Sequence, residues 1–163
     1  MKISTEGVLV FASAQGLCNE YKDKEFDYDF PNGLSKLLEQ QAIIALTTSD
    51  GDNLIIEFVD NSTIQENFDK EIEQIITLSP KDKLLILSHA EFTQICDANG
   101  DSENYRWPIE KIESIEAGKY LVNIKVKNTS SEFDKYEAYF KLTVSMTKIE
   151  NSKINNEVLE ISN

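Results

Sequence analysis

Apolar and polar residues alternate with a period of two in two neighbouring segments near the C-terminal end of the chain. In residues 119–127 the apolar positions are Tyr120, Val122, Ile124 and Val126, and in residues 137–146 they are Ala138, Phe140, Leu142, Val144 and Met146. A period of two gives an extended chain one apolar face and one polar face. The polar run 128–132 separates the segments, so we predict two half-buried strands with a turn between them.

Further strands are predicted in the rest of the chain. Residues 7–12 form a continuous apolar run, and residues 42–48 and 54–59 flank Ser-Asp-Gly-Asp, in which Asp-Gly is a strong hairpin signal. Residues 71–78 and 84–95 are predicted to pair across Ser-Pro-Lys-Asp, because proline favours the second position of a type I turn.

Together these patterns predict a mainly β protein. We expect an antiparallel β-sandwich of about seven to eight strands. It forms a single domain over residues 1–163, with a polar tail from residue 151. At most one or two short helices are expected, one of them over residues 34–41, where leucines follow Pro-Asn-Gly with helical spacing. The last apolar cluster of the tail, at residues 158–161, either adds an edge strand or frays.

Charge narrows the range of partners. The chain has 29 Asp and Glu against 16 Lys and Arg, and its formal net charge is −13 at pH 7. Such a surface repels nucleic acid and anionic membranes, and it attracts basic proteins. The N-terminal apolar stretch is too short for a signal peptide, and no apolar run approaches the roughly 20 residues that cross a bilayer. We therefore expect a cytoplasmic protein, and no cofactor is predicted.

Candidates for catalysis are few. The single histidine, His89, lies in the apolar run 84–90, where a lone histidine is more often a hydrogen-bonded structural group than a general base. Cys18 and Cys96 match no metal-binding or nucleophile motif, and two reduced thiols and one long-range disulfide both stay open. No catalytic residue is assigned on this basis.

Two further local sequences are interpreted as structural. Residues 97–103 alternate acidic or amide oxygens around a glycine, but the spacing departs from that of a calcium loop, so a hairpin turn at residues 99–101 is preferred to a metal site. The only arginine and the only tryptophan are adjacent, at Arg106 and Trp107. We expect Trp107 to pack in or beside the core, with Arg106 covering it or pairing with an acidic residue.

The most unusual local composition is that of residues 20–30, Glu-Tyr-Lys-Asp-Lys-Glu-Phe-Asp-Tyr-Asp-Phe. From residue 25 onward acidic and aromatic residues alternate, which predicts a strand with one acidic and one aromatic face. One interpretation is an edge strand whose charges discourage aggregation. The other is a surface where aromatic anchors bind a basic protein and acidic residues steer it. The partner-binding residues would then be Glu25, Phe26, Asp27, Tyr28 and Asp29.

A family resemblance sharpens this picture. Residues 54–63, Leu-Ile-Ile-Glu-Phe-Val-Asp-Asn-Ser-Thr, and residues 68–72, Phe-Asp-Lys-Glu-Ile, resemble the middle of the small acidic inhibitor of the competence DNA-entry nuclease. Residues 115–122, Ile-Glu-Ala-Gly-Lys-Tyr-Leu-Val, are similar to that family's Gly-x-Tyr strand start. Order and rough spacing agree over residues 54–127, with a longer insertion here between residues 92 and 112. The resemblance implies a β-sandwich that binds and inhibits a nuclease, as immunity proteins neutralise toxins.

We therefore predict a non-enzymatic, acidic protein-binding module. As an inhibitor or immunity protein it would neutralise a basic nuclease or toxin. The alternatives are a small-ligand-binding β-sandwich domain and a hydrolase that uses His89 with a carboxylate. A pocket lined by convergent polar groups favours either alternative. A flat or convex acidic patch around exposed aromatic residues favours protein binding.

Overall fold

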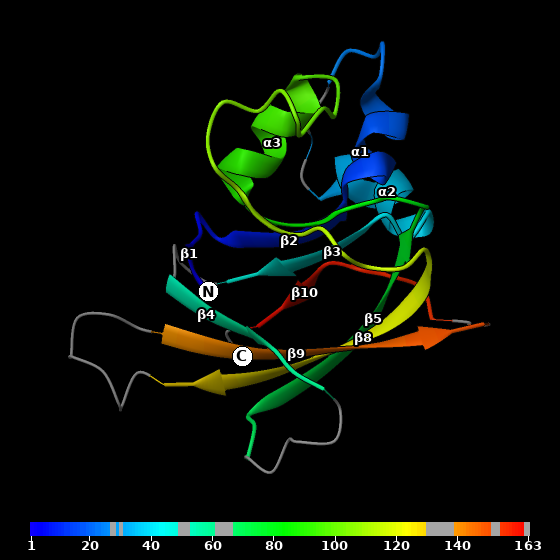
Figure 1. Ribbon diagram of the computed structural model, residues 1–163. Helices are drawn as coiled ribbons and strands as arrows, with labels where there is room; N and C mark the ends of the chain where they lie inside the picture. Colours follow the sequence, from blue (N-terminus) through cyan, green and yellow to red (C-terminus); the bar gives the residue numbers. More distant parts are fainter. Residues whose placement is uncertain are drawn as a thin grey trace.

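The computed structural model describes residues 1–26, 29, 31–48, 53–60, 67–129, 139–150 and 154–161. These residues form three layers: two five-stranded sheets packed face to face, and a layer of helices over the other face of one sheet (Figure 1). The helical layer contains α1 (Ala14–Tyr21), the 3₁₀ helix η1 (Asn32–Leu34), α2 (Ser35–Glu39) and α3 (His89–Asp97). None of the described helices is long and apolar enough to cross a membrane.

The ten described strands divide equally between the sheets. Sheet A has the order β1 (Lys2–Ser4), β4 (Asn53–Phe58), β9 (Tyr139–Ile149), β8 (Gly118–Asn128) and β5 (Lys70–Leu78). Sheet B, which the helices cover, has the order β10 (Leu159–Glu160), β3 (Ile43–Thr47), β2 (Val8–Ser13), β6 (Leu84–Ser88) and β7 (Glu110–Ile112). Along the chain, β1 is in sheet A, β2 and β3 in B, β4 and β5 in A, β6 and β7 in B, β8 and β9 in A, and β10 in B.

The predicted pair of alternating strands is confirmed by β8 and β9. They run antiparallel, with Ile124 opposite Val144 and Val126 opposite Leu142. All four side chains are buried between the sheets. The prediction that the chain is mainly β is also confirmed.

The sandwich is mixed, which corrects the prediction of an antiparallel fold. Strand β4 runs parallel to β9, and β10 runs parallel to β3. The described strands number ten instead of seven to eight, and three α-helices replace the expected one or two. The polar tail takes part in the fold, because its residues 159 and 160 form β10 at the edge of sheet B.

Both predicted hairpins outside β8 and β9 are wrong. Strands β3 and β4 lie in different sheets, and so do β5 and β6. The Ser-Asp-Gly-Asp sequence at residues 49–52 lies outside the described residues. The strands fall into different sheets because they differ in the number of their apolar faces. Strands β2, β3 and β6 are apolar on both faces and gather in sheet B, which is covered on both sides, whereas the alternating strands gather in sheet A.

Two helices interrupt segments that were predicted as strand or left unassigned. The predicted strand over residues 84–95 ends at Ser88, where α3 begins with a capping box: the Ser88 side chain accepts from the Glu91 amide, and the Glu91 carboxylate accepts from the Ser88 amide. Helix α1 also begins at a serine N-cap, because the Ser13 side chain accepts from the Gly16 amide at 2.8 Å. The predicted hairpin turn at residues 99–101 is instead the loop that follows α3.

The two sheets are joined by hydrogen bonds along one side. The Asn156 side chain donates to the carbonyl oxygens of Ile43 in β3 and Ile75 in β5, at 2.8 and 2.6 Å, and accepts from the Ile75 amide at 2.9 Å. The Thr77 amide in β5 donates to the Gln41 carbonyl at 2.8 Å. The opposite side lies between the edge strands β1 and β7, and we call it the open side.

Candidate functional site

The structure describes part of the predicted partner-binding segment. Glu25 and Asp29 are exposed, and Phe26 is half-buried, with its ring edge-on to Tyr21 at a centroid distance of 5.3 Å. Asp27 and Tyr28 lie outside the described residues. The strand predicted from residue 25 onward is wrong for the described part, because residues 25, 26 and 29 are in neither a strand nor a helix. Its role in partner binding stays a prediction.

Ion pairs offset the acidity near this segment. The Glu20 carboxylate contacts Lys24 at 2.9 Å and Lys36 at 2.7 Å, and its side chain is 13% exposed. Burial raises the pKa of Glu20, but the hydrogen bonds and charges of Lys36 and Lys24 outweigh it, and the net pKa lies below the ordinary range. These contacts tie α1 to α2 and hold Glu20 in its charged form.

The candidate catalytic residues lie on α3 and α1. His89 is the first residue of α3, not part of a strand, and it is half-buried. Cys96 lies two turns along the same helix, roughly 10 Å away at the rise of an α-helix. Burial raises the pKa of the Cys96 thiol, which opposes formation of the nucleophilic thiolate. Both cysteines are free thiols.

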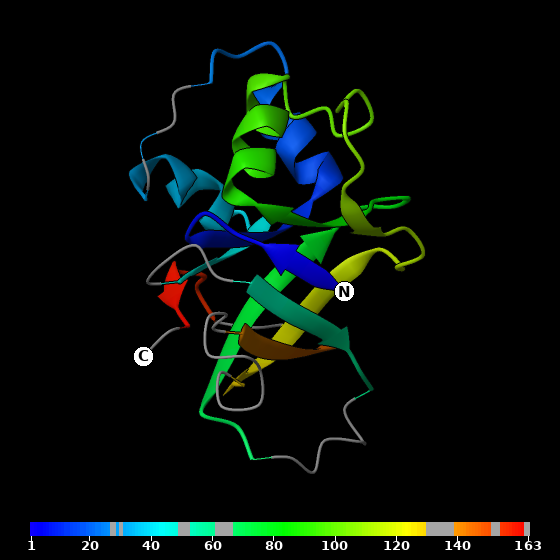
Figure 2. The same ribbon diagram turned by 90° about the vertical axis from the view of Figure 1, so that its left-hand side faces the viewer.

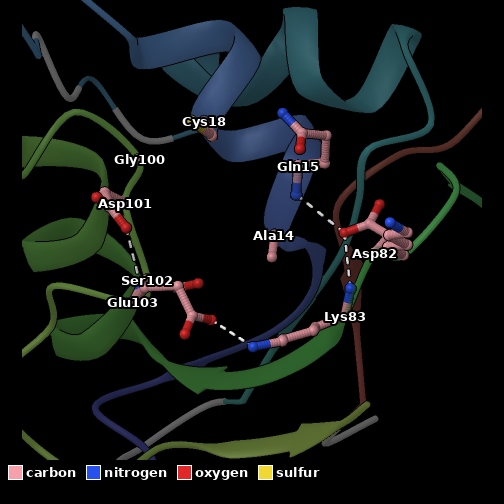
Figure 3. Close-up of a pocket in the computed structure, with 10 residues that line it drawn as sticks. Ala14, Gln15, Cys18, Asp82, Lys83, Gly100, Asp101, Ser102 and Glu103 are labelled. Carbon is pink, nitrogen blue, oxygen red and sulfur yellow. Dashed lines mark hydrogen bonds and ion pairs between the residues drawn. The ribbon is translucent and has the colours of Figure 1, made fainter. Parts of the chain in front are cut away.

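A hollow of about 280 Å³ lies where the start of α1, the turn before β6 and the loop after α3 meet (Figure 3). Its buried carboxylate, Asp82, accepts hydrogen bonds from the Ser13 hydroxyl at 2.5 Å and from the amides of Gln15, Ser79 and Lys83 at 2.9, 3.1 and 2.8 Å. The two carboxylate oxygens accept four hydrogen bonds, which connect these elements and leave the carboxylate no further strong acceptor position.

The charged groups at the rim of this hollow are also engaged. The Lys83 ammonium pairs with Glu103 at 2.6 Å, and this contact raises the pKa of Lys83. The Asp101 carboxylate accepts from the amides of Glu103 and Asn104, so it closes the turn in which a metal site was considered. Among the described residues, no three His, Cys, Asp or Glu side chains come together as metal ligands.

The only tryptophan of the chain is on the surface. Trp107 is 60% exposed, whereas the only other large apolar side chain exposed in the described part of the chain, Met1, is 37% exposed. The expectation that Trp107 packs in or beside the core is therefore wrong. The Arg106 guanidinium lies 5.3 Å from the centroid of the indole ring, as the expected cover predicts. Exposure of an indole ring to water is unfavourable, and no contact of the fold requires it here. Trp107 is therefore a candidate binding residue.

Trp107 begins a strip along the open side, residues 107–116, which we call the rim strip. Its sequence, Trp-Pro-Ile-Glu-Lys-Ile-Glu-Ser-Ile-Glu, repeats isoleucine and glutamate every three residues. The isoleucines at 109, 112 and 115 pack against the two cores, and the glutamates at 110, 113 and 116 are exposed. The sequence analysis missed this strip, although its period of three was visible and fits neither a helix nor a regular strand.

Two hollows lie along the rim strip. One, of about 300 Å³, is lined by β1 and by residues 108–110. The other, of about 520 Å³, lies between the end of the rim strip, the end of β4 and the middle of β9, and we call it the apolar groove. Its apolar lining is Phe58, Val59, Ile112, Ile115, Tyr120, Val144 and Met146. Asp60, Ser114 and Glu116 complete the lining, which contains no basic side chain.

The apolar groove is the place where the core between the sheets is least covered. The side chains of Phe58, Ile112, Ile115 and Met146 pack against this core but are only partly buried. Strand β7 ends at Ile112 and β8 begins at Gly118, so only residues 113–117 cross from one sheet to the other here. The groove is apolar because it exposes the edge of the core.

The chain was compared with protein families, curated proteins and solved structures. No family model matches the chain, and no curated protein matches it. Among solved structures, the chain is similar to a protein named "Crocagin biosynthetic gene J", with 11% sequence identity and a TM-score of 0.48 over 88% of this chain and 94% of that one. The resemblance to nuclease inhibitors stays a prediction.

Proposed function

We propose that this chain is a non-enzymatic, acidic protein-binding module of the inhibitor or immunity class, which neutralises a basic nuclease or toxin. The observation that carries the proposal is the exposure of Trp107 at the start of the rim strip, along which the glutamates at 110, 113 and 116 are also exposed. Tryptophan is enriched among residues that dominate binding energy, and surrounding acids raise the association rate with a basic partner. An exposed aromatic residue with acidic neighbours is the arrangement that favours protein binding over a small-molecule site.

The state of the candidate catalytic groups supports a binding role. Asp82 is saturated by its four donors, and Lys83 is paired with Glu103. The thiol of Cys96 is stabilised in its protonated form, two helical turns from His89. The Ser13 hydroxyl donates to Asp82, but this carboxylate also accepts from three backbone amides and Ser13 caps helix α1, so the contacts of both side chains account for their positions.

The net charge supports a basic partner. A nuclease presents a positive cleft to DNA, so an inhibitor that competes for the cleft gains affinity and association rate from its own negative charge. The charge of −13 provides such a long-range field in a chain of 163 residues. Because exposed charges are screened by salt, the association rate should fall as the ionic strength rises.

The experiment is a direct inhibition assay. The purified chain is titrated into the competence DNA-entry nuclease and into basic proteins that an immobilised sample retains at low salt and releases at high salt, and DNA degradation is followed. We expect stoichiometric loss of one nuclease activity. If the DNA-entry nuclease and every retained protein keep full activity at molar excess of the chain, the proposal is wrong.

Two variants locate the interface in the same assay. Trp107→Ala should speed dissociation of the complex by about thirtyfold, which corresponds to the roughly 2 kcal/mol of a hot-spot residue, and Trp107→Phe should recover part of the loss. Replacing Glu25, Asp27 and Asp29 by their amides should slow association and flatten its salt dependence if the predicted segment also steers the partner. In Figure 2 the described residues that follow α1 and the connection from α3 to β7 lie on different sides of the helices, so the two effects are separable.

A further inference from the structure

The asymmetry between the two sides of the sandwich points to one surface. On the closed side, Asn156 and the Thr77 amide link β5 to β3 and to the residues before it. On the open side, β1 is paired only with β4, and β7 only with β6, so each leaves one strand edge without a partner in the described sheets. The smaller hollow is lined by residues of both β1 and β7, and the apolar groove lies beyond β1, where β4 ends.

We propose that the apolar groove on the open side is the docking site for an extended basic segment of the partner, which inserts an aliphatic side chain between lysine or arginine residues. The inference rests on the proposed function and names the surface and the segment that it binds. The groove volume of about 520 Å³ accommodates more than one side chain. Its walls are the half-buried side chains of Phe58, Ile112, Ile115 and Met146, which lose exposed area when an apolar group enters.

Charge selects the flanking residues of the docked segment. The charged side chains in the groove lining are Asp60 and Glu116, both exposed carboxylates. Glu116 also contacts Lys148 at 3.0 Å, a surface pair in which a partner cation can take the place of the lysine at little cost. A segment with an apolar residue between two cations therefore fits both the walls and the rim, whereas an acidic segment is repelled.

Shape selects an extended conformation. Within the rim strip, Ile112, Ser114, Ile115 and Glu116 line the groove, and residues 108–110 line the other hollow. The two hollows therefore follow one another along a strip of ten residues that spans at most about 35 Å. A segment that lies along this strip is extended.

The test uses two synthetic peptides of equal charge as probes, Lys-Leu-Lys-Leu-Lys and Lys-Gly-Lys-Gly-Lys. Each is titrated into the ¹⁵N-labelled full chain, and amide shifts are mapped. We expect the leucine peptide to shift the amides of Val59, Ile115 and Met146, and to bind at least tenfold more tightly than the glycine peptide. Equal affinity of the two peptides, or shifts spread over the helical layer, would overturn the proposal.

A matched pair of variants separates the groove from the overall charge. Ser114→Arg places a bulky cation at the rim from an exposed position, and Gln40→Arg adds the same charge on an exposed residue of the helical layer. We expect Ser114→Arg to weaken the leucine peptide at least tenfold, Gln40→Arg by less than twofold, and Ser114→Glu to strengthen binding. Equal effects of the two arginine variants would overturn the proposal.

Failure of this inference is distinguishable from failure of the proposed function. If the wild-type chain and Ser114→Arg inhibit the nuclease equally, the groove is not the docking site although the chain is an inhibitor. If the wild-type chain inhibits no nuclease, the function fails, while the peptide titration still reports on the groove. Sedimentation measures whether the chain dimerises. If it does, and if Ser114→Arg abolishes the dimer, a second copy fills the groove and the proposal is overturned.

Discussion

Replacing the buried carboxylate Asp82 by asparagine tests whether the hollow in Figure 3 is a structural junction or a reactive site. Asp82 is 4% exposed and accepts four hydrogen bonds. Asparagine has nearly the same shape but one oxygen, so two of the four donors then face an amide nitrogen. At about 1.5 kcal/mol for each bond to a charged acceptor, Asp82→Asn should lower the free energy of unfolding by roughly 3 kcal/mol.

The assay is urea unfolding followed by circular dichroism and by the fluorescence of the single tryptophan. A loss of roughly 3 kcal/mol moves the midpoint by about 1.5 M at a typical slope of 2 kcal/mol/M. The matched control is Asp101→Asn, which changes a carboxylate with similar backbone contacts in a more exposed turn, where water replaces lost bonds. If Asp82→Asn costs no more than Asp101→Asn, the reasoning from buried donors is wrong. If the Asp82→Asn variant folds but no longer inhibits the nuclease, the hollow takes part in inhibition as well as in stability.

Three further predictions follow from single contacts. Gly100→Ala should destabilise the fold by at least about 2 kcal/mol, because φ is +70° there and a Cβ would meet the Leu17 carbonyl oxygen at 2.2 Å; denaturant unfolding measures this. Cys18, half-buried, should react with a thiol reagent in the native state, whereas Cys96 should react only after denaturation, and a Cys18→Ser variant without the fast reaction confirms the assignment. Glu20→Gln should lower the free energy of unfolding at pH 7, because a carboxyl whose pKa is lowered by folding contributes stability above its unfolded pKa of about 4.3. The difference in free energy from wild type, measured by urea unfolding, should shrink as the pH falls below that value.

Controls sharpen these three measurements. Gly7→Ala places a Cβ 3.8 Å from the Thr48 carbonyl oxygen, an ordinary contact distance, at φ +92°, so its cost should be mainly backbone strain and smaller than that of Gly100→Ala. Glu39→Gln removes the same charge from an exposed position of α2 and should show less pH dependence than Glu20→Gln. A disulfide in the purified protein, seen as two unreactive thiols after denaturation, would contradict the free cysteines.

The sequence alone was sufficient for the strands whose faces differ. The alternation around Ile124 and Val144 specifies one buried face, so β8 and β9 were predicted with their burial. Pairing was harder, because Asp-Gly favours a local turn but cannot show that β3 needs cover on both faces and β4 on one. The capping residues Ser88 and Glu91 predict the start of helix α3, but the apolar run before them favours a strand that continues through residue 95.

The candidate site was less predictable than the fold. A tryptophan is usually at least partly covered, and neighbouring residues give no measure of its exposure, so Trp107 was placed in or beside the core. Its exposure depends on where the loop after α3 returns to β7, which is a tertiary property. The acidic and aromatic segment that contains Glu25 was singled out by composition, but composition could not reveal that Phe26 packs on a helix.

The alternation of strands between the two sheets has a consequence for the rate of folding. Strand β4 pairs Asn53 with Tyr139, and β3 pairs Leu46 with Leu159, so each sheet contains neighbouring strands that are far apart in the sequence. Native contacts so distant in sequence slow folding, because long stretches of chain must be ordered before the contacts form. We therefore expect this protein to fold through a slow, cooperative step in which both sheets close together.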